Sequence, residues 1–359
     1  MQAIRIHAFS SSMDNLVIEE VPKPAPGSGE VLIKVLYAPV NPSDFNFIRG
    51  DYDSALSRVL WNRDRTPLAF DPEGLNQHPE PPYTIGGEGV GIVEAAGGGL
   101  LANRLVGKHV AFASGPPRGS WAQYTSIDAK KVFAVPDGLD TQQAAMYIFN
   151  PLSCYAMVLD VLRVQRGSWL LQSGAGSALG QMVVRLGRQR GFRTINIVRS
   201  EANIEKLRAL GADVVINTSE QDLREEVFKA TGGGGADYAM DCVGGELLTQ
   251  MMQCMALNGH MVVYGTLSGL SNTFFSRDLM MPCARVSGFF AGNWLAQKSL
   301  WQKLSIVRTL KKLHLAGVFK TDIDRVLPMQ DVNEAVRLVT TQGHQGKVLL
   351  AFEEPAVTP

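Results

Sequence analysis

The stretch that decides the fold reads Trp169-Leu170-Leu171-Gln172-Ser173-Gly174-Ala175-Gly176-Ser177-Ala178-Leu179-Gly180. Its first four residues predict a buried strand, and residues 178–190 have the apolar spacing of an amphipathic helix. Of the glycines between them, Gly174 allows a tight turn and Gly176 lets the backbone approach a pyrophosphate. Gly180 allows close packing of helix on strand. The amides and dipole at the helix start then favour phosphate groups, which predicts a dinucleotide site.

The glycine pattern indicates a dinucleotide site only when it lies between a strand and a helix. A Gly-x-Gly pair alone is weak evidence, and the spacing to Gly180 is one residue longer than in the usual fingerprint. The ordinary alternative is a glycine-rich turn of an α/β protein. The strand before the turn, the helix after it and the further βα units favour the dinucleotide. We therefore expect cofactor contacts from Gly174, Gly176, Ser177, Ala178, Leu179 and Gly180.

The end of the next strand indicates which dinucleotide is bound. This strand ends Ile197-Val198-Arg199-Ser200, where NAD-selective sites usually have an acidic residue for the ribose hydroxyls. A guanidinium and a hydroxyl instead suit the adenosine phosphate of NADPH. The alternative is a solvated arginine at a strand end, and the nearby Glu201 can begin the next helix. The sequence predicts NADPH.

The rest of the chain shows two different patterns of predicted secondary structure. The first third is strand-like and punctuated by Pro and Gly, which predicts a β-barrel. From near residue 140 strands and helices alternate, which predicts a doubly wound parallel sheet with helices on both faces. Tyr264-Gly265 ends one of these parallel strands, at the edge where ligands bind. We assign residues 143–290 to this α/β domain, and residues 1–142 with 291–359 to the barrel domain.

Composition excludes several classes of protein. The 359 residues suit two domains, and 34 Lys+Arg balance 34 Asp+Glu, so nothing favours a nucleic-acid or membrane partner. The four cysteines are scattered with no CxxC pair, which argues against a disulfide framework or a structural zinc. We find no secretory signal and no uninterrupted membrane span. A cytoplasmic protein with a small-molecule substrate is expected.

At this point the chain resembles the medium-chain dehydrogenase/reductase superfamily. It is most similar to the zinc-free branch that contains quinone reductases and 2-enoyl thioester reductases of mitochondrial type. Beside the central loop, the similarity rests on Asn41-Pro42-Ser43-Asp44, Gly50-Asp51-Tyr52, Gly86-Gly87-Glu88-Gly89, Asn150-Pro151, Asp241-Cys242-Val243-Gly244-Gly245, and Gly288-Phe289-Phe290 with Trp294. The resemblance implies a GroES-like barrel for the catalytic domain, a Rossmann domain for the cofactor, and a homodimer paired near residues 285–289.

The resemblance also implies chemistry without a metal. Zinc relatives have a Cys where Asn41 stands and a His where Gly87 stands, and a glycine has no side chain to ligate zinc. The catalytic residue implied is Tyr52, whose phenol stays protonated at neutral pH and can donate a hydrogen bond to an enolate. Asn41 is implied to lie near the nicotinamide.

Other positions are implied as contacts. The resemblance implies substrate contacts for Trp294 and Phe290, and cofactor contacts for Asn150 and Lys347. Each candidate keeps a structural alternative: a loop aromatic for Tyr52, a turn residue for Asn41 and an interdomain core residue for Trp294. Asn150 reads as a helix N-cap and Lys347 as a surface lysine.

Two departures from the enoyl reductases stand out. Residues 53–82 form an insertion directly after Tyr52, which we expect to reshape the substrate entrance, and Gly176-Ser177 replaces Asn-Ser. The leading hypothesis is hydride reduction of an activated C=C bond in a 2-enoyl thioester or enone. An NADPH:quinone oxidoreductase, and a nicotinamide-binding scaffold or redox sensor, are the alternatives. The physiological substrate, the pathway and the stereochemistry do not follow from the sequence.

Overall fold

The glycine-rich turn follows a central strand of a six-stranded parallel sheet. The structure is a computed structural model, and it describes residues 1–51, 80–341 and 346–352. The sheet has the order β11-β10-β9-β12-β13-β14, and every neighbouring pair is parallel. In chain order this is 3-2-1-4-5-6, the doubly wound arrangement whose order reverses beside its first strand. The turn therefore lies at the switch point of the sheet.

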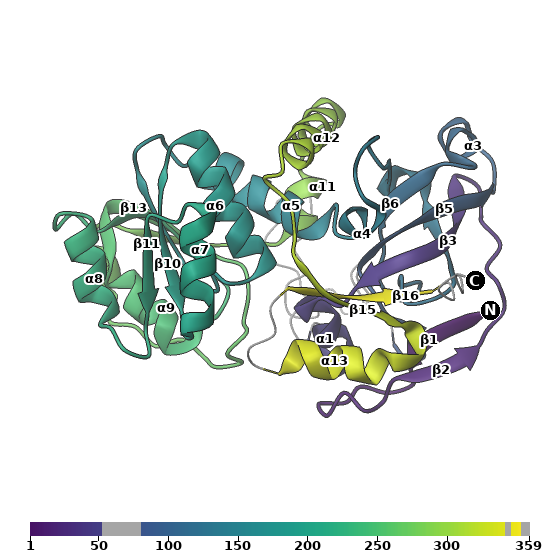
Figure 1. Cartoon of the computed structure of the whole chain (residues 1–359), viewed down its shortest axis with the longest axis horizontal. Coiled ribbons are helices and arrows are strands. Elements are labelled where there is room, and N and C mark those ends of the chain that lie inside the picture. The colour runs from purple at the N-terminus through teal and green to yellow at the C-terminus, as the bar shows by residue number, and fades with distance from the viewer. Residues whose placement is uncertain (52–79, 342–345, 353–359) are drawn as a thin grey trace, which may run out of the picture. The chain divides into compact units, whose positions relative to one another are not determined.

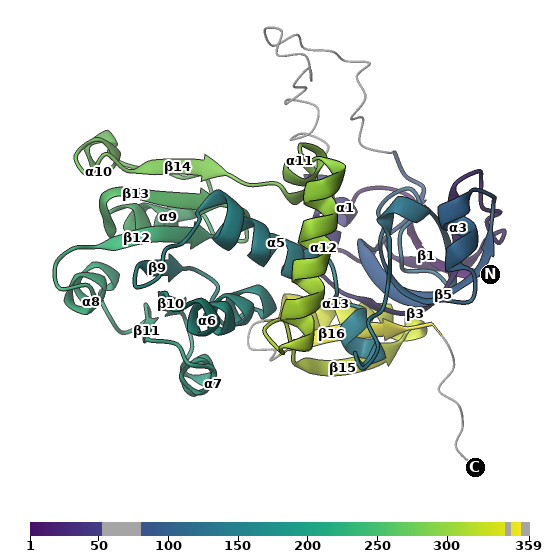
Figure 2. The same cartoon turned by 90° about the horizontal axis from the view of Figure 1, so that it is seen from above.

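The strands of this sheet are β9 (Trp169–Gln172), β10 (Arg193–Val198), β11 (Val214–Asn217), β12 (Ala236–Asp241), β13 (Met255–Val263) and β14 (Arg285–Gly288). The helices around it are α5 (Phe149–Tyr155), α6 (Ala178–Arg190), α7 (Ile204–Leu210), α8 (Leu223–Ala230), α9 (Gly245–Met252), α10 (Ser276–Met280), α11 (Ala291–Ala296) and α12 (Leu300–Leu315), with a π-helical segment at Ala156–Val161 (Figures 1 and 2). The predicted Rossmann domain is confirmed.

Successive residues of the central strands point to opposite faces of the sheet. On β9, Leu170 packs in a cluster with side chains of α5, α6 and α12, and Leu171 packs in a second cluster with side chains of α8 and α9. Met240 and Ala239 on β12 divide in the same way. Both faces are therefore covered, as a parallel sheet requires.

The observed division of the chain differs from the predicted one. The chain divides into one unit of residues 1–149 with 322–359 and a second of residues 150–321. Residues 291–321, which the sequence analysis assigned to the barrel domain, belong to the second unit. The reason is α12, whose Ile306, Leu310 and Leu313 are buried in the cluster under α5 and α6.

The first unit is built mainly on antiparallel strands, and β15 and β16 are its parallel pair. One sheet has the order β15-β16-β3-β5-β6-β8 with β7 paired to β3, and a smaller one has the order β2-β1-β4. Its elements are β1 (Gln2–Ile6), β2 (Val17–Glu20), β3 (Glu30–Pro39), α1 (Pro42–Arg49), β4 (Tyr83–Thr84), β5 (Glu88–Ala96), α3 (Leu100–Leu105), β6 (His109–Ala113), β7 (Tyr124–Asp128), β8 (Val132–Ala134), α4 (Thr141–Ala144), β15 (Ile323–Pro328), α13 (Val332–Thr340) and β16 (Lys347–Ala351). Trp121, Phe112 and Ile33 are fully buried in its core.

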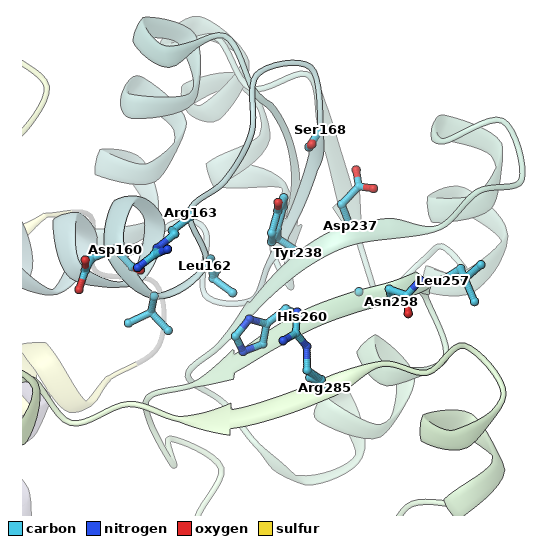
Figure 3. A pocket seen from close by; sticks show the side chains of 12 residues that line it. Asp160, Leu162, Arg163, Ser168, Asp237, Tyr238, Leu257, Asn258, His260 and Arg285 are labelled. Carbon is cyan, nitrogen blue, oxygen red and sulfur yellow. The ribbon is translucent and has the colours of Figure 1, made fainter.

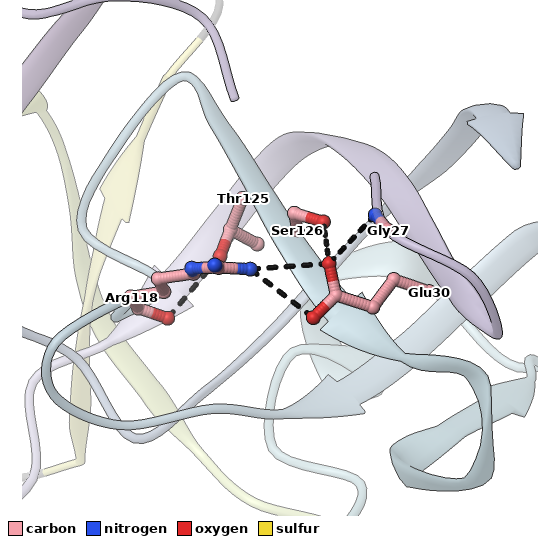
Figure 4. Close-up of polar contacts among 5 residues, drawn as sticks. All are labelled: Gly27, Glu30, Arg118, Thr125 and Ser126. Atoms are coloured by element: carbon pink, nitrogen blue, oxygen red, sulfur yellow. Dashed lines mark hydrogen bonds and ion pairs between the residues drawn. The ribbon is translucent and has the colours of Figure 1, made fainter. Parts of the chain in front are cut away.

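The half-buried carboxylate of Glu30 links several segments at one end of this unit. Glu30, at the start of β3, accepts hydrogen bonds from the Gly27 amide at 3.0 Å and the Ser126 hydroxyl at 2.8 Å (Figure 4). Arg118 Nη1 lies 3.1 Å from both carboxylate oxygens. The amide of Gly27, then Ser126, holds the pKa of Glu30 below its usual value. This contact ties the turn before β3 to β7 and to the loop that carries Arg118.

Strand β13 starts soon after α9. Helix α9 ends at Met252, and Met255 already pairs with Ala236 in the sheet. A register shift follows, and Asn258 has a φ of 61°, so β13 contains an irregularity. Among the described residues, no helix combines the length and the apolar character needed to span a bilayer.

Candidate functional site

The three glycines of the central turn are required for different reasons. Gly174 has a φ of +60°, and a Cβ there would lie 2.7 Å from Cys242 Sγ. A Cβ at Gly180 would lie 2.5 Å from the carbonyl oxygen of Ala175, so α6 packs directly on the turn. At Gly176 the space is filled by the Asn203 side chain, 2.8 Å from an added Cβ. Larger residues at Gly174 or Gly180 would displace the turn, whereas at Gly176 the side chain of Asn203 would have to move.

Ser177 sets the start of α6. Its side chain accepts a hydrogen bond from the Gly180 amide at 3.1 Å, and the Gln181 side chain donates to the carbonyl of Gly176 at 2.9 Å. The amides of Ala178 and Leu179 begin the helix and have no acceptor within it. These two donors and the helix dipole suit a phosphate group, so the turn fits the dinucleotide predicted for it.

A buried carboxylate supports the turn from the neighbouring strand. Asp241 ends β12 and is fully buried; its Oδ1 accepts from the Ser173 hydroxyl at 2.6 Å, and its Oδ2 from the Gly244 amide at 2.8 Å. Ser173 Oγ in turn accepts from the Cys242 amide at 3.0 Å. These bonds join the carboxyl ends of β9 and β12. They therefore fix the backbone against which the glycine-rich turn packs.

Tyr264 and Gly265 follow β13 at the same edge. The Tyr264 amide donates to the carbonyl of Asp241 at 2.8 Å, and a Cβ at Gly265 would lie 2.7 Å from the Cys242 carbonyl oxygen. Burial, with Cys242 and Asp241 nearby, raises the pKa of Tyr264, so its phenol stays protonated. The structure thus brings Gly174, Tyr264 and Gly265 together around Cys242.

Arg199 and Ser200 lie just beyond the end of β10. Both are exposed, and the Arg199 guanidinium forms no ion pair with any residue that the structure describes. The Ser200 hydroxyl accepts from the Ala202 amide at 3.3 Å and so caps the 3₁₀ turn of residues 201–203. Glu201 is in the first turn of that segment, as the sequence analysis expected.

Trp294 is held inside the second unit. Its Nε1 donates to Asp160 Oδ2 at 2.7 Å, and Lys298 Nζ lies 2.5 Å from the same oxygen. Tyr155 and Phe289 pack edge-on and tilted against its ring, with centroids 6.3 and 6.4 Å away. Trp294 is therefore half-buried and held by a hydrogen bond to the carboxylate of the Asp160–Lys298 salt bridge, which gives it a structural role.

Phe290 and Asn150 are the next two positions for which the sequence predicted contacts. Phe290 precedes α11 and is 53% exposed. Asn150 was expected to cap a helix, but α5 begins at Phe149, so Asn150 lies within its first turn and that prediction is wrong. Pro151 remains in the first turn, where a missing amide hydrogen costs nothing.

A buried polar cluster lies in the first unit. Asn41, Asp44, Glu88 and Lys347 are each at least 92% buried. Lys347 Nζ donates to Asn41 Oδ1, and Asn41 Nδ2 donates to Glu88 Oε1 at 3.2 Å. Glu88 Oε2 accepts from the amide of Phe149 at 2.9 Å. Lys347 is thus not the surface lysine that one interpretation allowed, and its ammonium fixes which way the Asn41 amide points.

Asp44 completes this cluster. Its Oδ2 accepts from the Asn41 backbone amide at 2.8 Å, and its Oδ1 is buried without a hydrogen bond to a described residue. Burial raises the pKa of Asp44 to about 7, although the Asn41 amide and Lys347 oppose the shift. Burial also raises the pKa of Glu88 and lowers that of Lys347. Two carboxyl groups thus share one ammonium, and the cluster takes up a proton near neutral pH.

Tyr52, the predicted catalytic residue, lies outside the described residues, as does nearly all of the predicted insertion after it. Its position relative to Asn41 is therefore still a sequence-based expectation.

Comparison with known proteins covers both units. Residues 27–137 match the family described as alcohol dehydrogenase GroES-like domain, and residues 178–312 match zinc-binding dehydrogenase. Among curated proteins, a mitochondrial enoyl-[acyl-carrier-protein] reductase of Dictyostelium discoideum is 27% identical over 90% of this chain and 87% of its own length. The protein of that name from Bos taurus is 29% identical over 91% and 82%.

Solved structures agree over the whole length. A putative NADPH:quinone reductase from Bacillus thuringiensis is 30% identical, with a TM-score of 0.85 over 98% of this chain and 99% of its own. The chain belongs to the medium-chain dehydrogenase/reductase superfamily. An Escherichia coli quinone oxidoreductase complexed with NADPH, 22% identical with a TM-score of 0.84 over 98% and 100%, has the same fold. The predicted superfamily, the GroES-like unit and the Rossmann unit are confirmed.

Membership of this superfamily raises the question of metal. At Gly87, where zinc relatives have a histidine, a Cβ would lie 2.5 Å from the Phe149 ring. Within the described ranges, no group of three or more His, Cys, Asp or Glu residues could hold a metal ion. A metal-free reaction stays a prediction.

A separate hollow of about 450 Å³ lies elsewhere in the Rossmann unit of this superfamily member. Its walls include Ser168, Asp237, His260 and Arg285, which lie at or near the amino-terminal ends of the strands (Figure 3). Dinucleotides bind at the carboxyl ends, so this hollow is not the cofactor site.

The sequence analysis missed several residues of the site. Ser173 and Asp241 were in quoted motifs but had no assigned role, and Asp44 and Glu88 were treated as family markers. An acidic residue directly after an apolar strand was the available signal for Asp241. The cluster at Asn41 had no local signal, because Lys347 lies 306 positions away from Asn41.

Proposed function

We propose that this chain is an NADPH-dependent reductase that transfers hydride to an activated C=C bond, in a 2-enoyl thioester or an enone. The observation that carries the proposal is the match to curated enoyl reductases, at 27% and 29% identity over 90% and 91% of the chain. The matched region includes both the turn that fits a dinucleotide and the unit that holds the buried cluster at Asn41.

The residues of the turn would hold the cofactor. Ala178 and Leu179 present amides for the pyrophosphate, and Tyr264 with Gly265 borders the same edge. A bound nicotinamide would supply the hydride for the β-carbon of the substrate. The chain's part is to orient the reactants and to stabilise the negative charge that develops on the carbonyl oxygen.

In this proposal Tyr52 donates a hydrogen bond to the enolate oxygen and serves as the proton source for the α-carbon. Asn41 donates one amide hydrogen to Glu88, and its oxygen accepts from Lys347. Its second amide hydrogen has no acceptor among the residues that the structure describes, and in this proposal it orients a nicotinamide or substrate oxygen.

The test is NADPH oxidation with a crotonyl thioester and with a simple quinone in parallel. Tyr52→Phe should lower kcat for the thioester about 100-fold, the usual contribution of a positioned acid. The matched control is Tyr238→Phe, at a tyrosine that lines the hollow near the amino-terminal ends of the parallel strands. Thioester turnover that survives Tyr52→Phe unchanged would contradict the mechanism.

A quinone reductase is the second candidate. It is favoured by the Bacillus thuringiensis structure, whose description is a putative NADPH:quinone reductase and which is 30% identical to this chain. Quinone reduction needs no proton from Tyr52, so turnover of the quinone alone, unaffected by Tyr52→Phe, would select this function.

The preference for NADPH over NADH is part of the proposal. Arg199 and Ser200 are exposed after β10, where a phosphate on the adenosine ribose would meet them. Arg199→Glu should raise KM for NADPH by about 10- to 100-fold, the value of a charge-assisted bond, and leave KM for NADH within a few-fold. Equal effects on both cofactors would refute the assignment.

We also propose a homodimer. Strand β14 pairs with β13 on one side, and Val286 on it is 41% exposed. Nearby apolar side chains are exposed too, namely Leu267, Leu270, Phe274, Phe275, Met280 and Met281. A second copy paired along β14 would cover this edge. Val286→Asp should convert the dimer to a monomer in analytical ultracentrifugation, whereas Val326→Asp on β15 should not.

Two minor proposals complete the function. The reaction needs no metal, so activity should be unchanged after dialysis against a strong chelator. A cytoplasmic location is proposed from the sequence, although the curated relatives carry the word mitochondrial in their names. Cell fractionation decides this point.

A further inference from the structure

The hollow of about 450 Å³ near the amino-terminal ends of the parallel strands takes no part in the proposed reaction. It lies on the sheet face that α5 and α12 cover nearer the carboxyl ends, where Met240 and Val262 are buried. Two positions earlier on the same face are Tyr238 and His260, which line the hollow instead. Its volume is within the usual range for small-molecule sites, so it has room for more than a single ion.

Three side chains form a row along the floor of this hollow. Tyr238 on β12 is in register with His260 on β13, and His260 is in register with Arg285 on β14. Side chains in register on neighbouring strands point to the same face of a sheet, so the three lie side by side. The end of the π-helical segment, with Asp160 and Arg163, forms one wall (Figure 3).

The two arginines of the hollow have donors to spare. Arg285 is exposed, and its guanidinium forms no ion pair with any residue in the described ranges. Arg163 donates from Nε to the carbonyl of Asp160 at 3.1 Å, and this is the one hydrogen bond of its guanidinium to a described residue. A guanidinium has five donors in a planar fork that matches a carboxylate or a phosphate.

The two carboxylates of the hollow already have partners. Asp160 Oδ2 accepts from Trp294 Nε1 at 2.7 Å and forms a salt bridge with Lys298. Asp237 Oδ2 accepts from the Trp169 backbone amide at 2.8 Å. Lys298 and the two arginines therefore outnumber the acids, which leaves an excess of positive charge at the hollow.

His260 lies inside this excess of positive charge. Its Nε2 is 2.8 Å from the Ser287 hydroxyl, and its Nδ1 has no hydrogen bond to a described residue. Burial, and then the charge of Arg285, lower the pKa of His260. An anion beside both side chains would offset that repulsion and would raise the pKa of His260.

We propose that this hollow binds a small organic anion, either a carboxylate or a phosphate monoester. The charged group meets Arg163, Arg285 and His260, and the apolar body lies beside Val161 and Leu257, which is 71% exposed. The inference does not rest on the proposed function, because the site is separate from the cofactor edge. Along β13 that edge is four residues beyond His260, or roughly 13 Å.

The test follows the imidazole signals of His260 by NMR, assigned by comparison with His260→Gln. Benzoate and phenyl phosphate are the probes, and benzamide is the neutral analogue of benzoate. Saturable shifts are expected with at least one of the anions and not with benzamide, and the stronger probe distinguishes the carboxylate from the phosphate. Binding of phenyl phosphate at the turn before α6 would leave the His260 signals in place.

A pH titration of the same signals gives a second measurement. Saturating benzoate should raise the pKa of His260, because a negative charge stabilises the imidazolium. The titratable and charged groups that line the hollow with it are Asp160, Arg163, Asp237, Tyr238 and Arg285. An unchanged pKa of His260 under saturating benzoate would contradict the proposed position of the carboxylate.

Calorimetry then identifies the groups that hold the anion. Arg163→Gln and Arg285→Gln should each raise the Kd of the stronger probe by about 10- to 100-fold, the value of a charge-assisted hydrogen bond. The matched control is Arg104→Gln, at an exposed arginine of the first unit, which should leave this Kd within two-fold. Thermal melting of each variant checks that it is folded.

Several outcomes would overturn the proposal. These are an unchanged Kd in both arginine variants, equal binding of benzamide, and the absence of His260 shifts with both anions. A second copy of the chain is the competing occupant, because β14 is the edge proposed for the dimer. If the anions shift His260 only in the monomeric Val286→Asp variant, the second copy fills the hollow and the proposal is wrong.

Discussion

Lys347 is the cation that the buried carboxyl groups of Asp44 and Glu88 share in the first unit. Removing one partner of a buried charge network leaves the others unpaired in a low dielectric. This is why a lysine so late in the chain matters for residues near its beginning.

We expect Lys347→Met to lower the free energy of unfolding by about 3–5 kcal/mol, because Glu88 and Asn41 lose their buried partner. Chemical denaturation measures this, with exposed Lys131→Met as the control. Adding Glu88→Gln should recover part of the loss. A change below about 1 kcal/mol for Lys347→Met would show that water reaches the cluster.

A second prediction concerns pH. The pKa of Asp44 is about 7 in the folded chain, above its ordinary value of 3.8, so the folded state binds this proton more tightly than the unfolded state. The resulting stabilisation is complete below about pH 4 and is lost as the pH rises to about 7. Glu88 acts with the same sign, since burial raises its pKa too.

Asp44→Asn keeps an acceptor for the Asn41 amide and removes the titration. The unfolding free energy should therefore fall less steeply between pH 4 and pH 7 than in the unmodified chain, by up to about 1.4 kcal/mol per pH unit. Denaturant titrations at a series of pH values give the slopes, and exposed Asp137→Asn serves as the control. Parallel slopes would mean that Asp44 stays ionised.

At the scale of elements, α6 depends on its closeness to the turn before it. A Cβ at Gly180 would lie 2.5 Å from a backbone oxygen, which cannot move as a flexible side chain does. The prediction that this glycine permits close packing is confirmed by that distance.

Gly180→Ala should lower stability by about 1–3 kcal/mol, the usual effect of overpacking, and weaken NADPH binding by moving the first amides of α6. The matched control is Gly115→Ala, where an added Cβ meets no atom within 4 Å. Thermal melting and fluorescence titration with NADPH measure the two effects. An unchanged affinity would mean that the helix start does not contact the cofactor.

The periodicity of apolar residues predicts some helices and strands more accurately than others. The predicted helix at residues 178–190 coincides with α6, because its apolar spacing and its glycine turn agree. In the strand-like first third, β6 begins at His109 only after the helix α3 and its turn, and that helix was not predicted. At β13 the irregularity near Asn258 breaks the regular alternation of side chains along the strand.

At the scale of the whole molecule, α12 decides where the second unit ends. Ile306, Leu310 and Leu313 are less than 7% exposed in the cluster that covers one face of the sheet. A fragment that stops at residue 290 would expose this face.

We therefore expect a fragment of residues 150–321 to fold and a fragment of residues 150–290 to fold poorly. Burial of three large aliphatic side chains stabilises the longer fragment by roughly 5–8 kcal/mol. Circular dichroism melts and amide hydrogen exchange compare them. If the two fragments unfold with equal cooperativity, residues 291–321 do not stabilise the second unit. They would then belong to the barrel domain, as the sequence had predicted.

The sequence by itself determined the parallel sheet, the glycine-rich turn between a strand and a helix, and the superfamily, because these depend on local patterns along the chain. Only the tertiary structure decided that Lys347 is buried against Asn41, that Asp241 supports the turn, and that α12 belongs with the sheet. Each of these is a contact between residues distant in the chain. Burial and charge pairing arise only once the fold brings such residues together, so no local pattern encodes them.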